Sequence, residues 1–160
     1  LDLFLTYGYN RARFDETDAD GNPQLFGGNQ FRLSPDHSLS AGFNYEKDAG
    51  YGTFFLTPSF TWRSRVFFEN ENDEAIAVFD PATLATVFTI PAVAQEAYGL
   101  VNLRAGLRLA EDRLEVYGYA ENLLDKDYII DAGNTGGGFG IPTFIAGAPR
   151  FWGGGVRVTF

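Results

Sequence analysis

The stretch that decides the fold is VNLRAGLRLAEDRLEVYGYAE, residues 101–121. Apolar and polar residues alternate on both sides of the pair Glu111-Asp112. Because successive side chains of a β-strand point to opposite faces, this alternation indicates two strands joined by a tight turn. One face of the hairpin is apolar and carries Val101, Leu103, Ala105, Leu107, Leu109, Leu114, Val116, Gly118 and Ala120. The other face carries Asn102, Arg104, Gly106, Arg108, Glu115, Tyr117, Tyr119 and Glu121.

The turn also predicts which residues pair across the hairpin. With Glu111-Asp112 as a two-residue turn, the expected pairs on the polar face are Arg108 with Glu115, Gly106 with Tyr117, Arg104 with Tyr119 and Asn102 with Glu121. A slip by one residue would move both arginines to the apolar face. If that face meets lipid, each arginine near the middle of the membrane would cost about 2–4 kcal/mol, so we expect this register to be strongly specified.

Similar alternation recurs along the chain. The pattern predicts six strands, at residues 1–13, 37–46, 51–66, 98–109, 113–121 and 151–160. In the third strand, Phe54, Leu56, Phe60, Trp62 and Val66 are expected on the apolar face. Pro58 interrupts the same strand and has no amide hydrogen for the ladder, so we expect a β-bulge there.

The connections between these strands alternate in length. Residues 46–50 and 110–113 are tight turns, whereas residues 14–36, 67–97 and 124–149 are long and rich in Gly, Pro, Asn and Asp. Long loops without structure are uncommon in compact soluble domains, but outer-membrane barrels have short periplasmic turns and long external loops. This asymmetry places Tyr7, Tyr9, Trp62 and Trp152 at the outer membrane interface, and Tyr45, Phe54 and Phe160 at the inner one. Within residues 67–97, a weak alternation around Asp80-Pro81 predicts a small hairpin over residues 75–79 and 84–90.

The composition excludes several classes of protein. The 160 residues carry a net charge of -9, no Cys and 16% aromatic residues. This content is too apolar for a disordered chain, and so acidic a chain lacks the basic face that a nucleic-acid partner requires. No run approaches the roughly 18 apolar residues of a membrane-spanning helix.

Three segments resemble one known family. They are ENLLDKDY at residues 121–128, AYGLVNLR at residues 97–104 and PDHSLS at residues 35–40. Together with the aromatic last strand, they closely resemble the C-terminal end of TonB-dependent outer-membrane receptors. The resemblance implies an all-β, antiparallel transmembrane barrel meander whose six strands form the C-terminal portion of a barrel of roughly 22 strands. Residues 1–160 are then the C-terminal barrel segment, and the N-terminal plug and the remaining strands lie outside this sequence.

The same resemblance implies a function and a set of partners. The expected protein is a receptor of the Gram-negative outer membrane that takes up a scarce ligand, most often a ferric siderophore, by active transport. Its expected partners are TonB with ExbB and ExbD, reached through the N-terminal part, and lipopolysaccharide. The barrel-assembly machinery is expected to recognise Phe160. No catalytic activity, cofactor or bound metal is expected.

Three alternatives remain open from the sequence. The hairpin at residues 75–90 supplies two further strands in the first alternative, which gives a complete eight-stranded barrel with a structural or adhesive role. The second is a passive porin. The third is a soluble sandwich, in which the apolar stripes would form an unexplained exposed surface.

The best candidates for ligand contact lie on the polar face near the outer end. Arg63 and Arg65 are candidates for a cationic rim that binds an anionic ferric chelate, with Tyr119 and Glu121 nearby. The competing interpretation is that the two arginines pair with loop carboxylates or with the plug. Deeper in the barrel, Arg104, Arg108 and Glu115 are expected to face the plug.

Other motifs favour structural roles. His37 is the only histidine, and strand geometry points it away from Ser38, which argues against a catalytic pair. Residues 16–21 resemble the start of a calcium-binding loop, but Gly27 stands where that loop needs a bidentate Glu. The Gly-rich residues 136–140 lack the dinucleotide-binding spacing. The acidic loops suit either solvation or divalent cations that bridge lipopolysaccharide.

Overall fold

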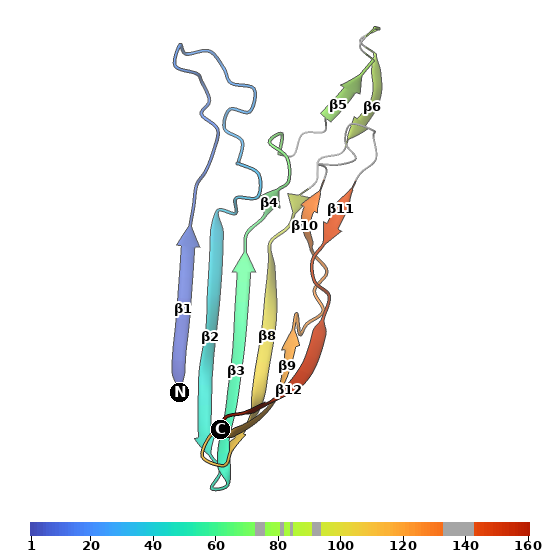
Figure 1. Ribbon diagram of the computed structural model, residues 1–160. Coiled ribbons are helices and arrows are strands. Elements are labelled where there is room, and N and C mark those ends of the chain that lie inside the picture. The colour runs from blue at the N-terminus through green and yellow to red at the C-terminus, as the bar shows by residue number, and fades with distance from the viewer. Residues whose placement is uncertain (73–75, 81, 84, 91–93, 133–142) are drawn as a thin grey trace.

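The computed structural model describes residues 1–72, 76–80, 82–83, 85–90, 94–132 and 143–160. These residues form an all-β structure dominated by one large sheet (Figure 1). The strands of this sheet are β1 (Asp2–Tyr9), β2 (His37–Asp48), β3 (Gly52–Arg63), β8 (Tyr98–Leu109), β9 (Leu114–Glu121) and β12 (Phe151–Val158). Among the described residues, no helix is long and apolar enough to cross a membrane.

The large sheet is an antiparallel meander. Its six strands lie in the order β1-β2-β3-β8-β9-β12, so each strand pairs with the next sheet strand along the chain. Figure 1 shows the tight turns and the C-terminus at one end of the sheet, and the long connections at the other. We call these connections the first loop (residues 10–36), the second loop (64–97) and the third loop (122–150). The expected six-stranded meander with alternating connection lengths is confirmed.

The central hairpin has the register that its sequence predicts. Arg108 pairs with Glu115, Gly106 with Tyr117, and Arg104 with Tyr119. The fourth expected pair lies one step beyond the last ladder pair, Leu103 with Ala120, and there the Asn102 side chain accepts a hydrogen bond from the amide of Asn122. At the turn, Ala110, Glu111 and Asp112 all have positive φ, and the Arg113 amide donates to the Ala110 carbonyl at 3.2 Å. This left-handed backbone matches the twist of the two strands that it joins.

The bulge expected at Pro58 is absent. The β2 and β3 pairs on either side, Gly42 with Ser59 and Tyr45 with Leu56, keep the same offset, and Pro58 stays paired with Leu103 on β8. The prediction was wrong because a proline need not displace its neighbours. The ladder between β2 and β3 simply omits the two pairs at this point and then resumes.

The sheet has two different faces, and within the described ranges no second layer of strands packs on either face. One side, which we call the apolar face, exposes large hydrophobic residues, among them Trp152 at 76%, Val156 at 66% and Val158 at 54%. Arg104 and Arg108 lie on the opposite side, which we call the polar face, together with Phe55. Tyr45 and Phe54 meet edge to face on the apolar face, with ring centroids 6.4 Å apart. This separation of the two faces is the one that the alternating sequence predicts.

Three small sheets lie in the second and third loops. They pair β4 (Val66–Phe67) with β7 (Ala94–Gln95), β5 (Ile76–Phe79) with β6 (Thr86–Ile90), and β10 (Ile129–Ala132) with β11 (Phe144–Ala146). The hairpin predicted in the second loop is confirmed as β5 and β6, although positions 75 and 84 lie outside the described residues. Because β3 pairs directly with β8, this hairpin adds no strands to the large sheet, which argues against the eight-stranded alternative.

The third sheet strand ends earlier than its sequence pattern predicts. β3 stops at Arg63, and Val66 belongs to β4, where it is 3% exposed among loop residues. The expectation that Val66 continues the apolar stripe was therefore wrong. The Ser64 amide donates to the His37 carbonyl, which closes the β2 and β3 ladder and lets the chain turn into the loop.

Candidate functional site

A charged cluster covers the inner part of the polar face. Glu115, on β9, is 8% exposed and accepts a hydrogen bond from Arg104 on β8. Arg108 Nε lies 3.6 Å from Glu115 Oε2, and Arg108 Nη2 donates to Glu46 Oε1 on β2 at 2.6 Å. Both guanidinium groups lie 5.1 Å from the ring centroid of Phe55. The two arginines therefore neutralise the two glutamates and shield the phenyl ring from water.

The sequence predicts that Arg104, Arg108 and Glu115 face the plug, and the charged cluster contains all three residues. Arg104, Arg108 and Glu115 do lie together on the polar face, as the register requires. They find their charge partners within the sheet itself, so they need none from elsewhere. That they also contact a plug stays a prediction.

Two tyrosine rings lie across the last strand. Tyr117 pairs with Gly155 and Tyr119 with Gly153. A methyl group added at Gly155 would come within 2.6 Å of the Tyr117 ring, and one added at Gly153 within 2.8 Å of the Tyr119 hydroxyl. The other side of Tyr117 is occupied by Arg104, whose guanidinium lies 4.1 Å from the ring centroid. A side chain at either β12 position would require the facing tyrosine ring to move, so glycine suits the space that the rings occupy.

A polar groove runs beside these rings. It has a volume of about 480 Å³, and its lining includes Thr57, Ser59, Asn102, Arg104, Tyr119 and Glu121. Glu121 is exposed, and Tyr119 is half-buried and contacts Phe151 with ring centroids 6.0 Å apart. The two predicted ligand contacts on β9 therefore share one groove. Hydroxyl, amide and carboxylate groups around an aromatic ring suit a polar ligand.

The two predicted rim arginines lie elsewhere and differ from each other. Arg63 is exposed at the end of β3, with its guanidinium 4.9 Å from the ring centroid of Tyr98. Tyr98 in turn stacks on Tyr128 of the third loop at 4.7 Å. Arg65 lies over the Phe67 ring at 4.6 Å, and its Nε is 3.1 Å from Glu96 Oε1. Arg65 thus has the loop carboxylate that the competing interpretation names, whereas Arg63 presents its charge at the mouth.

The loops have a hydrophobic core of their own. Phe68 is fully buried and clusters with Val66 and Ala132, and Ile129 packs against them. Two polar contacts lie beside this core. Arg32 Nη2 of the first loop lies 3.7 Å from Asp131 Oδ1 of the third loop, and the Ile129 amide of the third loop donates to Gln95 Oε1 of the second at 2.8 Å. The core around Phe68 thus joins the second and third loops, and the contact between Arg32 and Asp131 links the first loop to the third.

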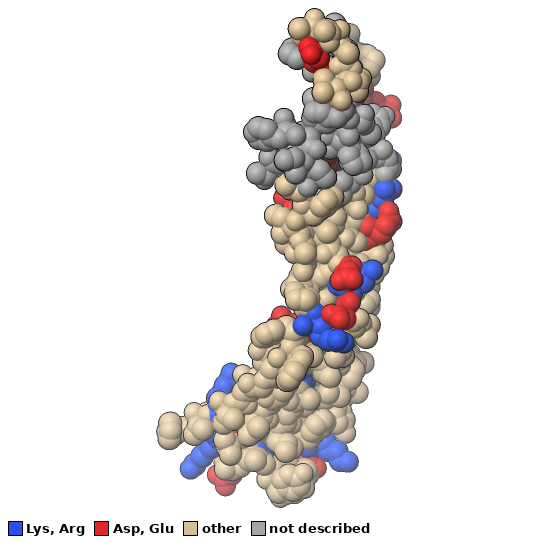
Figure 2. All heavy atoms as spheres, turned by 90° about the vertical axis from the view of Figure 1, so that its right-hand side faces the viewer, with Lys and Arg blue, Asp and Glu red and all other residues tan. Residues whose placement is uncertain are grey.

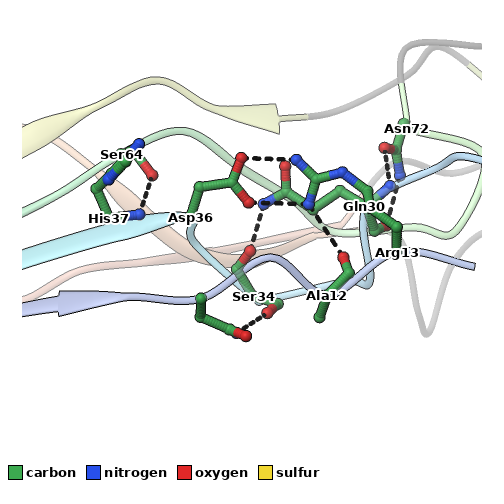
Figure 3. A network of polar contacts seen from close by, with 9 residues as sticks. Ala12, Arg13, Gln30, Ser34, Asp36, His37, Ser64 and Asn72 are labelled. Atoms are coloured by element: carbon green, nitrogen blue, oxygen red, sulfur yellow. Dashed lines mark hydrogen bonds and ion pairs between the residues drawn. The ribbon is translucent and has the colours of Figure 1, made fainter.

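A polar network closes the base of the first loop (Figure 3). Arg13 donates from both terminal nitrogens to Asp36, at 2.8 and 2.6 Å. These bonds lower the pKa of Asp36, although partial burial opposes the effect, and they raise the pKa of Arg13. The same network includes Ser34, which accepts a hydrogen bond from Asn10 at its hydroxyl and one from Gln30 at its carbonyl. Each end of the loop is thus fixed at the entrance to β2.

The remaining motifs have structural partners. His37 Nδ1 lies 2.7 Å from the Tyr7 hydroxyl, and the centroid of its ring lies 6.1 Å from that of Tyr7 and 5.2 Å from that of Tyr9. Asp18 accepts from the amide and side chain of Asn22, which lowers its pKa. No group of residues suited to hold a metal occurs in the described part of the chain. The Gly-rich residues 136–140 lie outside it.

The charged residues are unevenly distributed over the surface. Figure 2 shows acidic and basic side chains near the middle of the molecule and toward both ends, with a broad uncharged surface between the middle group and the lower end. Phe160 is fully exposed beyond the end of β12, where the Thr159 amide donates to the Arg113 carbonyl.

The fold and its two contrasting faces are those of an outer-membrane barrel wall. The family model of the TonB dependent receptor-like β-barrel matches residues 1–123, which is more than half of the 160 residues. The chain therefore belongs to the TonB-dependent receptor barrel family, as its sequence motifs predicted.

A solved structure of the same fold is the ferric yersiniabactin uptake receptor FyuA from Yersinia pestis. The two chains share 18% sequence identity with a TM-score of 0.74, over 99% of this chain and 21% of that receptor. The chain thus spans about one fifth of the length of the solved receptor. Among curated proteins, no sequence matches it.

Sequence reasoning missed several residues that organise these sites. Phe55 has the same parity as Thr53 and Thr57, so the alternation contained the signal that places it on the polar face. Phe68 had no such signal. It follows Val66 and Phe67 in an apolar run without alternation, and its partners come from a distant segment.

Proposed function

We propose that this chain is the C-terminal part of the barrel wall of an outer-membrane receptor that takes up a scarce ligand, a ferric siderophore, with energy supplied through TonB. The single observation that carries the proposal is the family match over residues 1–123. The apolar face supports it, because such a surface is stable where lipid covers it. The name of FyuA as a ferric yersiniabactin uptake receptor favours an iron chelate as the ligand class.

The proposed cycle assigns roles to the described residues. An anionic ferric chelate meets Arg63 at the mouth and then the groove that contains Tyr119 and Glu121. A plug supplied by the N-terminal part of the receptor is displaced by TonB, with ExbB and ExbD, to let the ligand pass. Lipopolysaccharide surrounds the outer end, and the barrel-assembly machinery reads the terminal Phe160.

Uptake in living cells tests the proposal. The full-length receptor is expressed in a Gram-negative host that lacks the gene, with and without functional TonB. Radioactive ferric iron, complexed by the siderophore that the host secretes, is the probe. We expect uptake that depends on both the receptor and TonB. Uptake that persists without TonB would instead favour a passive porin, and accumulation of haem or cobalamin alone would exclude the siderophore.

The role of Arg63 is tested in the same assay. Its charge is exposed and lies over Tyr98, and none of the described carboxylates forms an ion pair with it. We expect Arg63→Ala to raise the concentration of ferric siderophore needed for half-maximal uptake by about tenfold. Arg65→Ala is the matched control, because Arg65 is paired with Glu96. Equal effects of the two substitutions would remove the special role of Arg63.

A further inference from the structure

The side chain of Asn72 joins two loops by imitating a β-bridge. Its Oδ1 accepts from the amide of Gln30 at 2.8 Å, and its Nδ2 donates to the carbonyl of Gln30 at 2.9 Å. Figure 3 shows this contact between the second loop and the first. Asn72 Nδ2 also lies within 3.3 Å of the carbonyls of Glu69 and Asn70 on its own loop. One amide group therefore satisfies backbone groups of both loops.

Two more hydrogen bonds cross the same boundary. Asn29 donates from its side chain to the Asn70 carbonyl at 2.9 Å, and the Leu33 amide donates to the Phe67 carbonyl at 2.8 Å. Gln30 itself is only 7% exposed, so its backbone polar groups have little access to water and depend on Asn72. Asn72 has φ of 58°, a left-handed conformation that asparagine tolerates better than most residues.

The third loop is attached to this joint through the core around Phe68. Ala132 and Ile129 pack there, Arg32 of the first loop lies 3.7 Å from Asp131, and the Ile129 amide donates to Gln95 of the second loop. Each contact alone is weak, but Ile129 takes part in both the core and the bond to Gln95, and Asp131 lies between the core residues Ile129 and Ala132 in the chain. Contacts that share partners in this way open together rather than singly.

We propose that the described parts of the three loops form one preassembled body, with Asn72 and Gln30 as its joint, and that this body opens cooperatively. Separate flexible loops would exchange their amides independently, each at the rate of its own local opening. In a joined body, loss of the Asn72 side-chain amide must also speed hydrogen exchange at the backbone amides of Leu33 and Ile129. Neither of these backbone amides bonds to Asn72.

Amide hydrogen exchange in the full-length receptor, purified in detergent without ligand, tests this inference. We expect Asn72→Ala to accelerate exchange at least about tenfold in the segments that contain Leu33 and Ile129, besides Gln30. Asn22→Ala is the matched control, because Asn22 bonds only to Asp18 within the first loop. Acceleration confined to Gln30, with Leu33 and Ile129 unchanged, would overturn the proposal.

A crosslink distinguishes a lost joint from a misfolded loop. Asn29 donates from its side chain to the backbone carbonyl of Asn70, so the two residues are neighbours across the joint, and we introduce the Asn29→Cys/Asn70→Cys pair as a crosslink whose formation on oxidation is verified by loss of free thiols. In the Asn72→Ala background, we expect oxidation of this pair to restore slow exchange at Ile129, and reduction to remove it. Failure of the oxidised protein to recover protection in the third loop would also overturn the proposal. Neither measurement uses a ligand, so the result is independent of the uptake assay.

Discussion

The large sheet and the loop body bury hydrophobic residues in opposite ways. On β1 and β12, residues such as Leu3 and Trp152 are both 76% exposed on the apolar face, whereas Phe68 in the loops has no exposed surface. The sheet is one layer held by its ladder, and its apolar face needs an external medium to cover it. The loops, which lie in water, supply their own cover. Large apolar side chains of this kind are thus exposed on the sheet, whereas the Phe68 side chain is buried in the loops. The boundary between these two regions lies where β3 ends at Arg63.

The largest expected effect comes from emptying the loop core. Phe68→Ala should destabilise the loop body by about 3–5 kcal/mol, because it removes a fully buried ring from a small cluster. The sheet should remain folded, since none of its ladder pairs involves Phe68. Limited proteolysis of the full-length receptor, read together with the heat-modifiable migration of its barrel, measures both regions. Loss of the folded barrel band would contradict a division into two regions.

A charge on the apolar face should have the next largest effect. Leu103 lies midway along β8 and pairs with Pro58 and Ala120. Leu103→Arg should lower the free energy of unfolding by about 2–4 kcal/mol in lipid vesicles, measured by denaturant titration. Ser59→Arg is the control, because Ser59 pairs with Asn102 on the polar face and therefore receives the same charge on the opposite side of the sheet. Similar losses for the two variants would remove the distinction between the faces.

The smallest expected effect is a pH dependence confined to the loops. Burial raises the pKa of Glu69, with Glu71 and Asp131 adding to the effect and Arg32 opposing it. A carboxyl whose folded pKa is raised contributes stability below its unfolded pKa and loses it as the pH rises through the folded pKa. The loop body should therefore become more sensitive to protease as the pH rises above the ordinary pKa of a glutamate carboxyl, and Glu69→Gln should flatten that profile.

The Arg13 and Asp36 pair gives the opposite sign within the same loops. The hydrogen bonds from Arg13 hold the pKa of Asp36 low, so this contribution is present above the unfolded pKa of Asp36 and is lost as the pH falls through the folded pKa. Protease sensitivity at the base of the first loop should then rise only in acid.

The Glu69 prediction has its own contradicting outcome. If Glu69→Gln leaves the pH profile of protease sensitivity unchanged, burial of the Glu69 carboxyl contributes nothing to the stability of the loop body.

The sheet was predictable because its information is local. Alternation assigns each residue to a face, and a two-residue turn then determines the register, which is why Arg108 and Glu115 could be paired from sequence. The error at Val66 shows the limit of this reasoning. Its parity matches the apolar face, but the strand ends at Arg63, and periodicity does not show where a strand ends.

The loop body was not predictable because its contacts join distant segments. Gln30 and Asn72 are separated by 42 positions, and neither belongs to a periodic pattern. The sequence did indicate that Arg65 has two alternative partners, and the structure places Glu96 beside it. The choice depended on the course of the second loop, which composition alone does not determine.

The tyrosines that rest on β12 have a consequence for how this strand varies among relatives. An alanine at position 155 would collide with the Tyr117 ring, and a small residue at position 117 would leave bare backbone facing the lumen. A side chain at position 155 therefore requires the Tyr117 ring to move or to be replaced, and the same holds for Gly153 with Tyr119. In an alignment of the family, positions 117 and 155 should therefore covary, and so should positions 119 and 153.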